Sequence, residues 1–284
     1  MRKTYDRLFV VYKPPNIGSN RYLGEIKRKY SVKKAGFSGT LDPFAKGVLI
    51  VAFGKYTKLF RFLKKSPKSY RATLWLGAQS ETLDIEKISK IDIIKPFDRK
   101  KIEEALKSFP KELKYLPPKY CAKKIEGKKA YELARSNKDV KLDEITSTIY
   151  DISFSHYMHP FLTFEITISE GGYVRSIGSL IAQKLGYDGS LSSLERLREG
   201  EFVYENEKEL DPLRYLDIKE NFYLGNYDDL KLGKKVNLND FKIKDEGTYL
   251  IKLDNMFSII KIMDDQVKYL LNGVNYADTI KKKR

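Results

Sequence analysis

The chain has 284 residues, and 54 lysines and arginines against 38 aspartates and glutamates give it a formal net charge of +16 at pH 7. A hydrophobic content of 42% suffices for a packed core, which excludes a disordered tail, and no run of about 20 apolar residues could cross a bilayer. The only cysteine is Cys121 and the only histidines are His156 and His159, so we expect a soluble cytoplasmic protein with no disulfide, no metal and no Ser-His-Asp chemistry.

The first half of the chain shows strand and helix patterns without the regular alternation of a doubly wound parallel sheet. Apolar runs and periodicity predict strands at residues 8–12, 48–54 and 70–76, and helices at residues 20–30 and 56–64. Within 70–76, apolar residues alternate with Arg71 and Thr73, which is the period of a half-buried strand. These patterns support an α+β fold with a mixed sheet.

The second half continues the mixture of strands and helices up to about Pro212, and after that residue the pattern changes to short strands. It is expected to contain helices at residues 101–109 and 174–186, and strands at residues 146–154 and 161–168 around a turn at His159 and Pro160. Short strands follow at residues 248–253, 257–262 and 267–270. We therefore expect a larger domain over residues 1–212 and a small β-rich domain over residues 213–284.

The positive charge is clustered along the chain. A nucleotide bias of the source genome would also enrich lysine on solvated faces, but each cluster here has a tyrosine within or beside it. Cations neutralise phosphates and flat rings stack on unpaired bases, so the leading partner is looped or single-stranded RNA. The clusters are Lys27, Arg28, Lys29, Lys33 and Lys34, then Lys64, Lys65, Lys68 and Arg71, then Lys119, Lys123, Lys124, Lys128 and Lys129, beside Tyr30, Tyr70, Tyr120 and Tyr131.

Residues 36–47, GFSGTLDPFAKG, form a loop punctuated by glycines. Taken alone, Asp42 followed by Pro43 is typical of a helix start, with aspartate as N-cap and proline in the first turn. Glycines in such a loop also permit tight turns or the close approach of a ligand. The loop alone favours a structural interpretation, and longer strings are needed to decide.

The longer string GFSGTLDPFAKGVLIVAFGKYTKL strongly resembles the catalytic segment of the TruB family of tRNA pseudouridine synthases, which make pseudouridine 55 in the T-loop of tRNA. Further matching strings follow the family's order over about 200 residues. They are KPPNIGSN at 13–20, KSYRATLWLG at 68–77, QSETLDIEK at 79–87, LPPKYCAKKIEGKKAYELAR at 116–135, GGYVRSIGSLIAQKLG at 171–186 and LERLREG at 194–200.

The resemblance implies a pseudouridine synthase fold, α+β with a mixed, largely antiparallel central sheet. It implies a catalytic domain over residues 1–212 and, over residues 213–284, an RNA-binding module that is PUA-like in many relatives. It also implies a set of site residues. Asp42 falls on the family's nucleophile, Tyr70 on its active-site tyrosine and Arg175 on its active-site arginine. The residues expected to bind substrate are Lys13, Lys33, Lys34, Phe37, Asp84 and Leu194. A guanidinium beside a carboxylate favours its charged form, so we predict that Arg175 pairs with Asp42 and with Asp84.

Three positions depart from the family pattern. Phe37 replaces the histidine five residues before the nucleophile, so the side chain can still stack on the flipped nucleotides but cannot hydrogen-bond to them. Cys121 replaces a serine. Lys87 replaces the glycine that ends the acidic string, which bears on loop geometry more than on chemistry.

The implied reaction breaks the glycosidic bond of uridine, turns the detached base and joins C5 to C1′, after the base has been flipped out of its stack. It needs no cofactor, and the resemblance implies the T-arm of tRNA as partner, with no metal, membrane or obligate protein partner. Attack of Asp42 at C1′ or at C6 of the base remains open. Two alternatives also remain: an RNA-binding folding chaperone with weak or lost catalysis, and a synthase of ribosomal RNA inside a guide-RNA particle, against which the compact chain counts.

Overall fold

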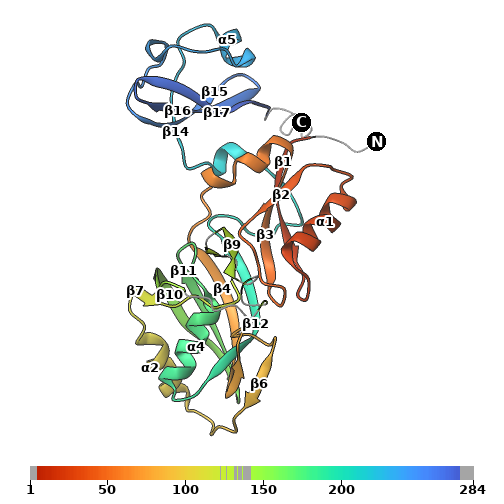
Figure 1. Cartoon of the computed structure of the whole chain (residues 1–284), viewed down its shortest axis with the longest axis vertical. Coiled ribbons are helices and arrows are strands. Elements are labelled where there is room, and N and C mark those ends of the chain that lie inside the picture. The colour runs from red at the N-terminus through yellow and green to blue at the C-terminus, as the bar shows by residue number, and fades with distance from the viewer. Residues whose placement is uncertain are drawn as a thin grey trace.

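The computed structural model describes residues 5–121, 123–125, 127–130, 133, 136 and 142–275. One large mixed sheet forms the body of an elongated molecule, and a separate four-stranded sheet lies at one end of it (Figure 1). Within the described ranges, no helix is long and apolar enough to span a membrane.

The large sheet is mixed and mainly antiparallel, as the sequence predicted. Its strands are β1 (Arg7–Lys13), β2 (Ala35–Ser38), β3 (Lys46–Phe53), β4 (Lys68–Leu76), β7 (Glu112–Tyr115), β10 (Ile145–Met158), β11 (Phe161–Ile168), β12 (Gly189–Glu199) and β13 (Glu209–Leu210). They run in the order β13-β1-β3-β12-β4-β11-β10-β7, and β2 pairs with the free end of β3. Only β3 and β12 are parallel, over two residue pairs, Lys46 with Glu195 and Gly47 with Arg196. Past this short contact the two strands part, which opens the sheet at its centre.

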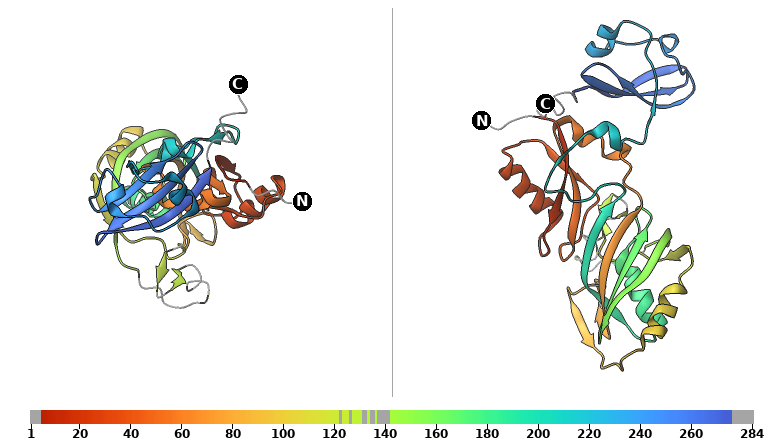
Figure 2. Two further views of the ribbon diagram at one scale, coloured as in Figure 1. Left: turned by 90° about the horizontal axis from the view of Figure 1, so that it is seen from above. Right: turned by 180° about the vertical axis from the view of Figure 1, so that it is seen from behind.

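In the part of the chain that the structure describes, three helices cover the sheet, and smaller elements extend it. The helices are α1 (Ser19–Lys29), α2 (Arg99–Lys107) and α4 (Val174–Lys184), and the two-stranded sheets are β5 (Ala78–Ser80) with β6 (Ile88–Ile91) and β8 (Lys124–Ile125) with β9 (Lys128–Lys129). Helices α2 and α4 pack on one face of β12, β4, β11 and β10. In the view from above, the β8–β9 hairpin stands away from the sheet (Figure 2).

Burial on both faces explains the continuous apolar runs of β1 and β3. On one face, Phe9 and Val11 pack with α1 through Ile26. On the other face, Leu8 and Val10 pack with residues of the C-terminal sheet. Strand β4 differs, because only its Tyr70-to-Leu76 face is buried against α4 while Arg71 and Thr73 pair with polar residues of β11. The period-two prediction for this strand is confirmed.

The C-terminal sheet packs against the main body. It contains β14 (Lys219–Glu220), β15 (Gly247–Lys252), β16 (Met256–Met263) and β17 (Gln266–Asn275), with the short helix α5 (Tyr227–Leu232) beside it. Phe257 and Ile259 of this sheet share a core cluster with Leu8 and Ile50, and the hydroxyl of Tyr56 donates to the carbonyl of Asn275 (2.9 Å). These contacts join the C-terminal sheet to β1, β3 and the 3-10 turn that follows β3.

Two local predictions were wrong. Residues 56–64 form two 3-10 turns, η1 (Gly54–Lys58) and η2 (Phe60–Phe62), instead of one α-helix. A distant segment supplies the reason, because the carbonyl of Phe62 accepts from Asp217 N (2.8 Å) and Lys64 N donates to Tyr215 O (2.9 Å). No helix starts at Asp42 either: the chain makes one turn there and enters β3.

Candidate active site

Asp42 lies in the loop that joins β2 to β3, beside the point where β3 leaves β12. The carbonyl of Asp42 accepts from Ala45 N (3.1 Å), which closes a tight turn around Pro43. The loop thus projects Asp42 into the opening of the sheet, and its side chain is 34% exposed.

Arg175, in the first turn of α4, binds two carboxylates at once. Its Nε lies 2.9 Å from Oδ2 of Asp42, and its Nη1 lies 3.2 Å from Oδ2 of Asp84. The guanidinium also donates to the carbonyls of Thr82 (2.7 Å) and Tyr120 (2.9 Å). Arg175 is only 4% exposed, and the predicted pairing with both aspartates is confirmed. Such a fork fixes the orientation of each carboxylate as well as its charge.

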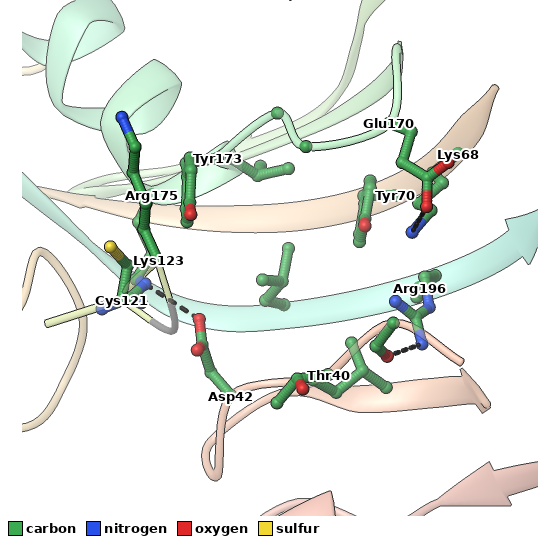
Figure 3. Close-up of a pocket in the computed structure, with 16 residues that line it drawn as sticks. Thr40, Asp42, Lys68, Tyr70, Cys121, Lys123, Glu170, Tyr173, Arg175 and Arg196 are labelled. Atoms are coloured by element: carbon green, nitrogen blue, oxygen red, sulfur yellow. Dashed lines mark hydrogen bonds and ion pairs between the residues drawn. The ribbon is translucent and has the colours of Figure 1, made fainter. Parts of the chain in front are cut away.

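A cavity of about 370 Å³ opens beside this pair. Tyr70 from β4 and Leu194 from β12 line it, and both are nearly buried. Figure 3 shows Tyr70 and Tyr173 across the cavity from Asp42. A second hollow of about 290 Å³ shares Asp42, Arg175 and Cys121 with the first, so the ion pair stands between the two. The larger cavity offers a flat planar ligand an aromatic ring, an apolar side chain and a carboxylate.

Electrostatics at Asp42 balance burial against nearby cations. Burial raises the pKa of the Asp42 carboxyl, while Arg175 and then Lys13 oppose that rise. Lys13 is fully buried, and its ammonium donates to the carbonyls of Ile17 (2.7 Å), Pro14 (2.9 Å) and Pro43 (3.3 Å). Burial lowers the pKa of Lys13 to about 8, and Asp42 acts in the opposite direction. Lys13 therefore holds the turn that carries Asp42 and places a positive charge near it.

Comparison with known proteins explains this arrangement. The profile of the TruB family pseudouridylate synthase (N terminal domain) matches residues 27–174. The chain belongs to the TruB family. It is 56% identical over 275 residues to tRNA pseudouridine synthase B of Sulfurovum sp. (strain NBC37-1), covering 96% of this chain and 99% of that protein. It is 48% identical over 267 residues to tRNA pseudouridine synthase B of Campylobacter concisus (strain 13826), covering 94% and 98%. This TruB-family protein is therefore an isomerase of the pseudouridine synthase class.

Solved structures show the same fold at low identity. A Cbf5-Nop10-Gar1 complex matches with a TM-score of 0.65 and 18% identity, covering 94% of this chain and 85% of that one. An H/ACA RNP bound to a substrate RNA containing 2′-deoxyuridine matches with a TM-score of 0.60 and 17% identity, covering 95% and 84%. The pseudouridine synthase fold expected from the sequence is confirmed.

The remaining predicted substrate-binding residues lie outside the cavity of this TruB-family protein. Lys33 and Lys34 are exposed between α1 and β2, where they are accessible to phosphates. Phe37 lies on β2, opposite Val51 of β3, and packs partly against the core beneath α1. Neither cavity is lined by Phe37.

The second and third basic clusters are only partly available as a surface. Lys68 is 7% exposed and pairs with Glu199, which corrects its assignment to a solvated basic cluster. Arg71 pairs with Glu165 on the open face of β4. Lys123 lines the larger cavity, whereas Tyr131 lies outside the described residues.

The loop that holds Asp84 explains one departure from the TruB pattern. Oδ1 of Asp84 accepts from Glu86 N (2.9 Å) and from the hydroxyl of Thr82 (2.5 Å), so both carboxylate oxygens are bound. Lys87 adopts φ 55°, a left-handed conformation in which glycine is normally favoured. Its ammonium donates to the hydroxyl of Tyr120 (2.7 Å), a contact that glycine could not make.

Among the residues that line the cavity, sequence reasoning gave no site role to Tyr173 and Arg196, and it placed Lys68 in a basic cluster. Burial and the neighbouring Cys121 raise the pKa of the Tyr173 hydroxyl. The signal for the other two is strand periodicity, since Lys68 lies two residues before Tyr70 and Arg196 two residues after Leu194. Residues spaced by two share one face of a strand.

Proposed function

We propose that this enzyme isomerises uridine 55 in the T-loop of tRNA to pseudouridine, with Asp42 as nucleophile and no cofactor. The tRNA substrate is supported by relatives that match nearly the whole chain and are named tRNA pseudouridine synthase B. The observation that carries the mechanism is the carboxylate of Asp42, fixed by Arg175 at a cavity lined by Tyr70 and Leu194.

The reaction balances without an external reagent. The N1–C1′ bond of uridine breaks, a C5–C1′ bond forms, C5 loses its proton and N1 gains one. Asp42, as the ionised carboxylate, forms a covalent bond with the substrate, at C1′ or at C6, that is broken again before product leaves. Because the base stays in the pocket, no second carboxylate is required to expel it.

The roles of the other cavity residues follow from the chemistry of their side chains. The ring of Tyr70 stacks on the extracted uracil, and its hydroxyl assists removal of the C5 proton. Leu194 supplies an apolar surface against the base. The uridine reaches them by base flipping, which costs a few kcal/mol that phosphate contacts from residues such as Lys33 and Lys34 offset.

The domain roles belong to the same proposal. Residues 1–212 carry the chemistry and residues 213–284 contribute RNA binding, in a protein that works in the cytoplasm without metal or obligate protein partner. Lys13 and Asp84 act on the substrate indirectly, by holding the loops that surround the cavity, whereas Phe37 on β2 offers its ring for stacking with the RNA.

One experiment tests the reaction, the position and the nucleophile together. Unmodified tRNA transcript is incubated with the wild type or with Asp42→Asn in buffer containing EDTA, and pseudouridine is mapped by carbodiimide modification and primer extension. We expect one stop in the T-loop with the wild type and none with Asp42→Asn. The variant should still bind the transcript.

The same experiment addresses the chaperone alternative. A protein that only binds and refolds tRNA would produce no stop in either reaction despite tight binding. A stop outside the T-loop would refute the position, and a stop with Asp42→Asn would refute the nucleophile.

A further inference from the structure

A buried cluster of charges lies at the end of the cavity opposite Arg175 (Figure 3). Arg196 is 1% exposed and Glu199 0% exposed, and Nη2 of Arg196 lies 3.3 Å from Oε2 of Glu199. The ammonium of Lys68 lies 3.2 Å from Oε1 of the same glutamate. Burying three charges is costly unless they are paired, so such a cluster calls for a structural or functional reason.

A β-bulge in β12 brings this cluster together. The pairing of β12 with β4 shifts register between Arg196 and Arg198, so that Tyr70 opposes Arg196 while Lys68 opposes Glu199. In a regular strand, residues three apart point to opposite faces, but the extra residue of a bulge re-aims the side chain that follows. Arg196 and Glu199 therefore both point inward and Arg198 is exposed.

Arg196 contacts the Asp42 loop at its start. Nη2 donates to the carbonyl of Gly39 (2.9 Å), and Nε donates to the carbonyl of Val48 on β3 (2.8 Å). Gly39 has φ +66°, and a Cβ built on it would lie 3.0 Å from both Glu199 Oε1 and Lys68 Nζ. The loop backbone thus rests directly on the charge cluster.

The backbone of Arg196 contacts the same loop at its end. Gly47, at φ +113°, lies so close that a Cβ there would be 2.3 Å from the carbonyl oxygen of Arg196. One residue of β12 therefore holds both ends of the segment 39–47, and Lys13 holds its middle through Pro43.

We propose that Arg196, with Glu199 as its counter-ion, is a positioning residue that fixes the Asp42 loop at the reacting sugar and base. The inference rests on the proposed role of Asp42 as nucleophile. Lys68 completes the cluster, since it neutralises the second oxygen of Glu199 and keeps the carboxylate from turning away from Arg196. A displacement of the nucleophile by about 1 Å can lower the rate about 100-fold. A rigid anchor for its loop can therefore outweigh the cost of burying these charges.

The test separates positioning from binding and from folding. Arg196→Lys keeps a cation beside Glu199 but lacks the fork that reaches both Gly39 and Val48. Arg198→Lys is the matched control, because it makes the same change on the same strand at an exposed position. Single-turnover rates at saturating T-arm RNA, RNA affinity by filter binding and thermal unfolding are measured for each.

We expect Arg196→Lys to lose about 10- to 100-fold in single-turnover rate while its Kd for RNA stays within about 3-fold of wild type. Arg198→Lys should match the wild type in rate. Glu199→Gln provides a second variant, which keeps the side-chain shape but removes the carboxylate that pairs with Arg196, while Lys68 keeps its ion pair with Glu170 (3.7 Å). It should lose rate in the same way if Arg196→Lys does not fold.

Wild-type rates in folded Arg196→Lys or Glu199→Gln would overturn the inference. A parallel loss of rate and RNA affinity would also overturn it, since a general structural role predicts that pattern. Asp42→Asn is included so that the two proposals fail differently: an active Asp42→Asn refutes the nucleophile, whereas an inactive Asp42→Asn beside a fully active Arg196→Lys refutes only the anchor.

Discussion

Replacing Arg175 with methionine should damage both stability and chemistry, because four polar groups depend on that guanidinium. Methionine roughly fills the volume of the side chain but removes its charge and every donor. Asp42 and Asp84 lose their shared cation, and the carbonyls of Thr82 and Tyr120 lose a donor. The loss of the cation destabilises Asp84 most, because its side chain is only 4% exposed.

The size of the effect follows from burial. Removing one partner of a buried ion pair costs about 3–5 kcal/mol, since the other charge is left without compensation. We assign this cost to Asp84 alone, because the side chain of Asp42 is 34% exposed and water screens its share. Arg175→Met should therefore lower the free energy of unfolding by about 3–5 kcal/mol at neutral pH.

Asp42 adds a smaller, pH-dependent part to this loss of stability, and lowering the pH should reduce that part. Burial already raises the pKa of Asp42, and removal of Arg175 takes away the largest opposing influence. The folded variant then binds a proton that the unfolded chain has released, so its stability relative to wild type falls as pH rises and recovers as pH falls. The acid limb of its residual activity should also move to higher pH, because only the ionised carboxylate reacts.

Urea unfolding at several pH values and single-turnover assays check these expectations. Arg99→Met is the control, because the side chain of Arg99 is 74% exposed and makes surface contacts with Glu103 and the ring of Phe154. It should change stability by less than about 1 kcal/mol. An Arg175→Met protein as stable as this control, or with an unmoved acid limb, would refute the role given to the guanidinium.

Other predictions concern residues outside the ion pair. Changing Lys33 and Lys34 to alanine should weaken T-arm binding and reduce its salt dependence, both measured by filter binding. The single-turnover rate at saturating RNA should stay unchanged. Wild-type binding that does not depend on salt would contradict a basic binding surface. The double variant His156→Ala and His159→Ala should keep full activity, with or without EDTA, in the primer-extension assay. Between pH 8 and 10.5, Lys13 holds a proton in the unfolded chain but releases it in the folded chain. The free energy of unfolding of the wild type, measured in urea relative to that of Lys13→Met, should therefore rise by about 3 kcal/mol over this range. A difference that stays constant with pH would exclude the lowered pKa of Lys13.

Local patterns predicted most of the fold. The strands expected at 8–12, 48–54 and 70–76 all form, because each is either buried on both faces or buried on one face with strict alternation. The helix expected at 56–64 fails because residues 215 and 217 take its backbone hydrogen bonds. A contact over about 150 residues of sequence leaves no local pattern.

Site residues could be predicted from the sequence where the reaction requires particular residue types. They could not be predicted where their position depends on packing between distant strands. Resemblance to a family located Asp42, Arg175 and Asp84, and an ion pair between them followed from charge alone. Lys68 counted as a surface cation because lysine is rarely buried, and only the pairing of β4 with a bulged β12 places it beside Glu199.

The surroundings of Asp42 suit a carboxylate that must stay ionised while a polyanion binds. Phosphates arriving near the cavity favour protonation of Asp42, and burial acts in the same direction. Arg175 and Lys13 oppose both effects, and neither can leave the site, because each is held by several hydrogen bonds inside the protein. The exposed lysines proposed to bind RNA, Lys33 and Lys34, are different residues. Separating the cations that hold the nucleophile from those that hold the substrate lets RNA binding and release proceed without disturbing the charge of Asp42.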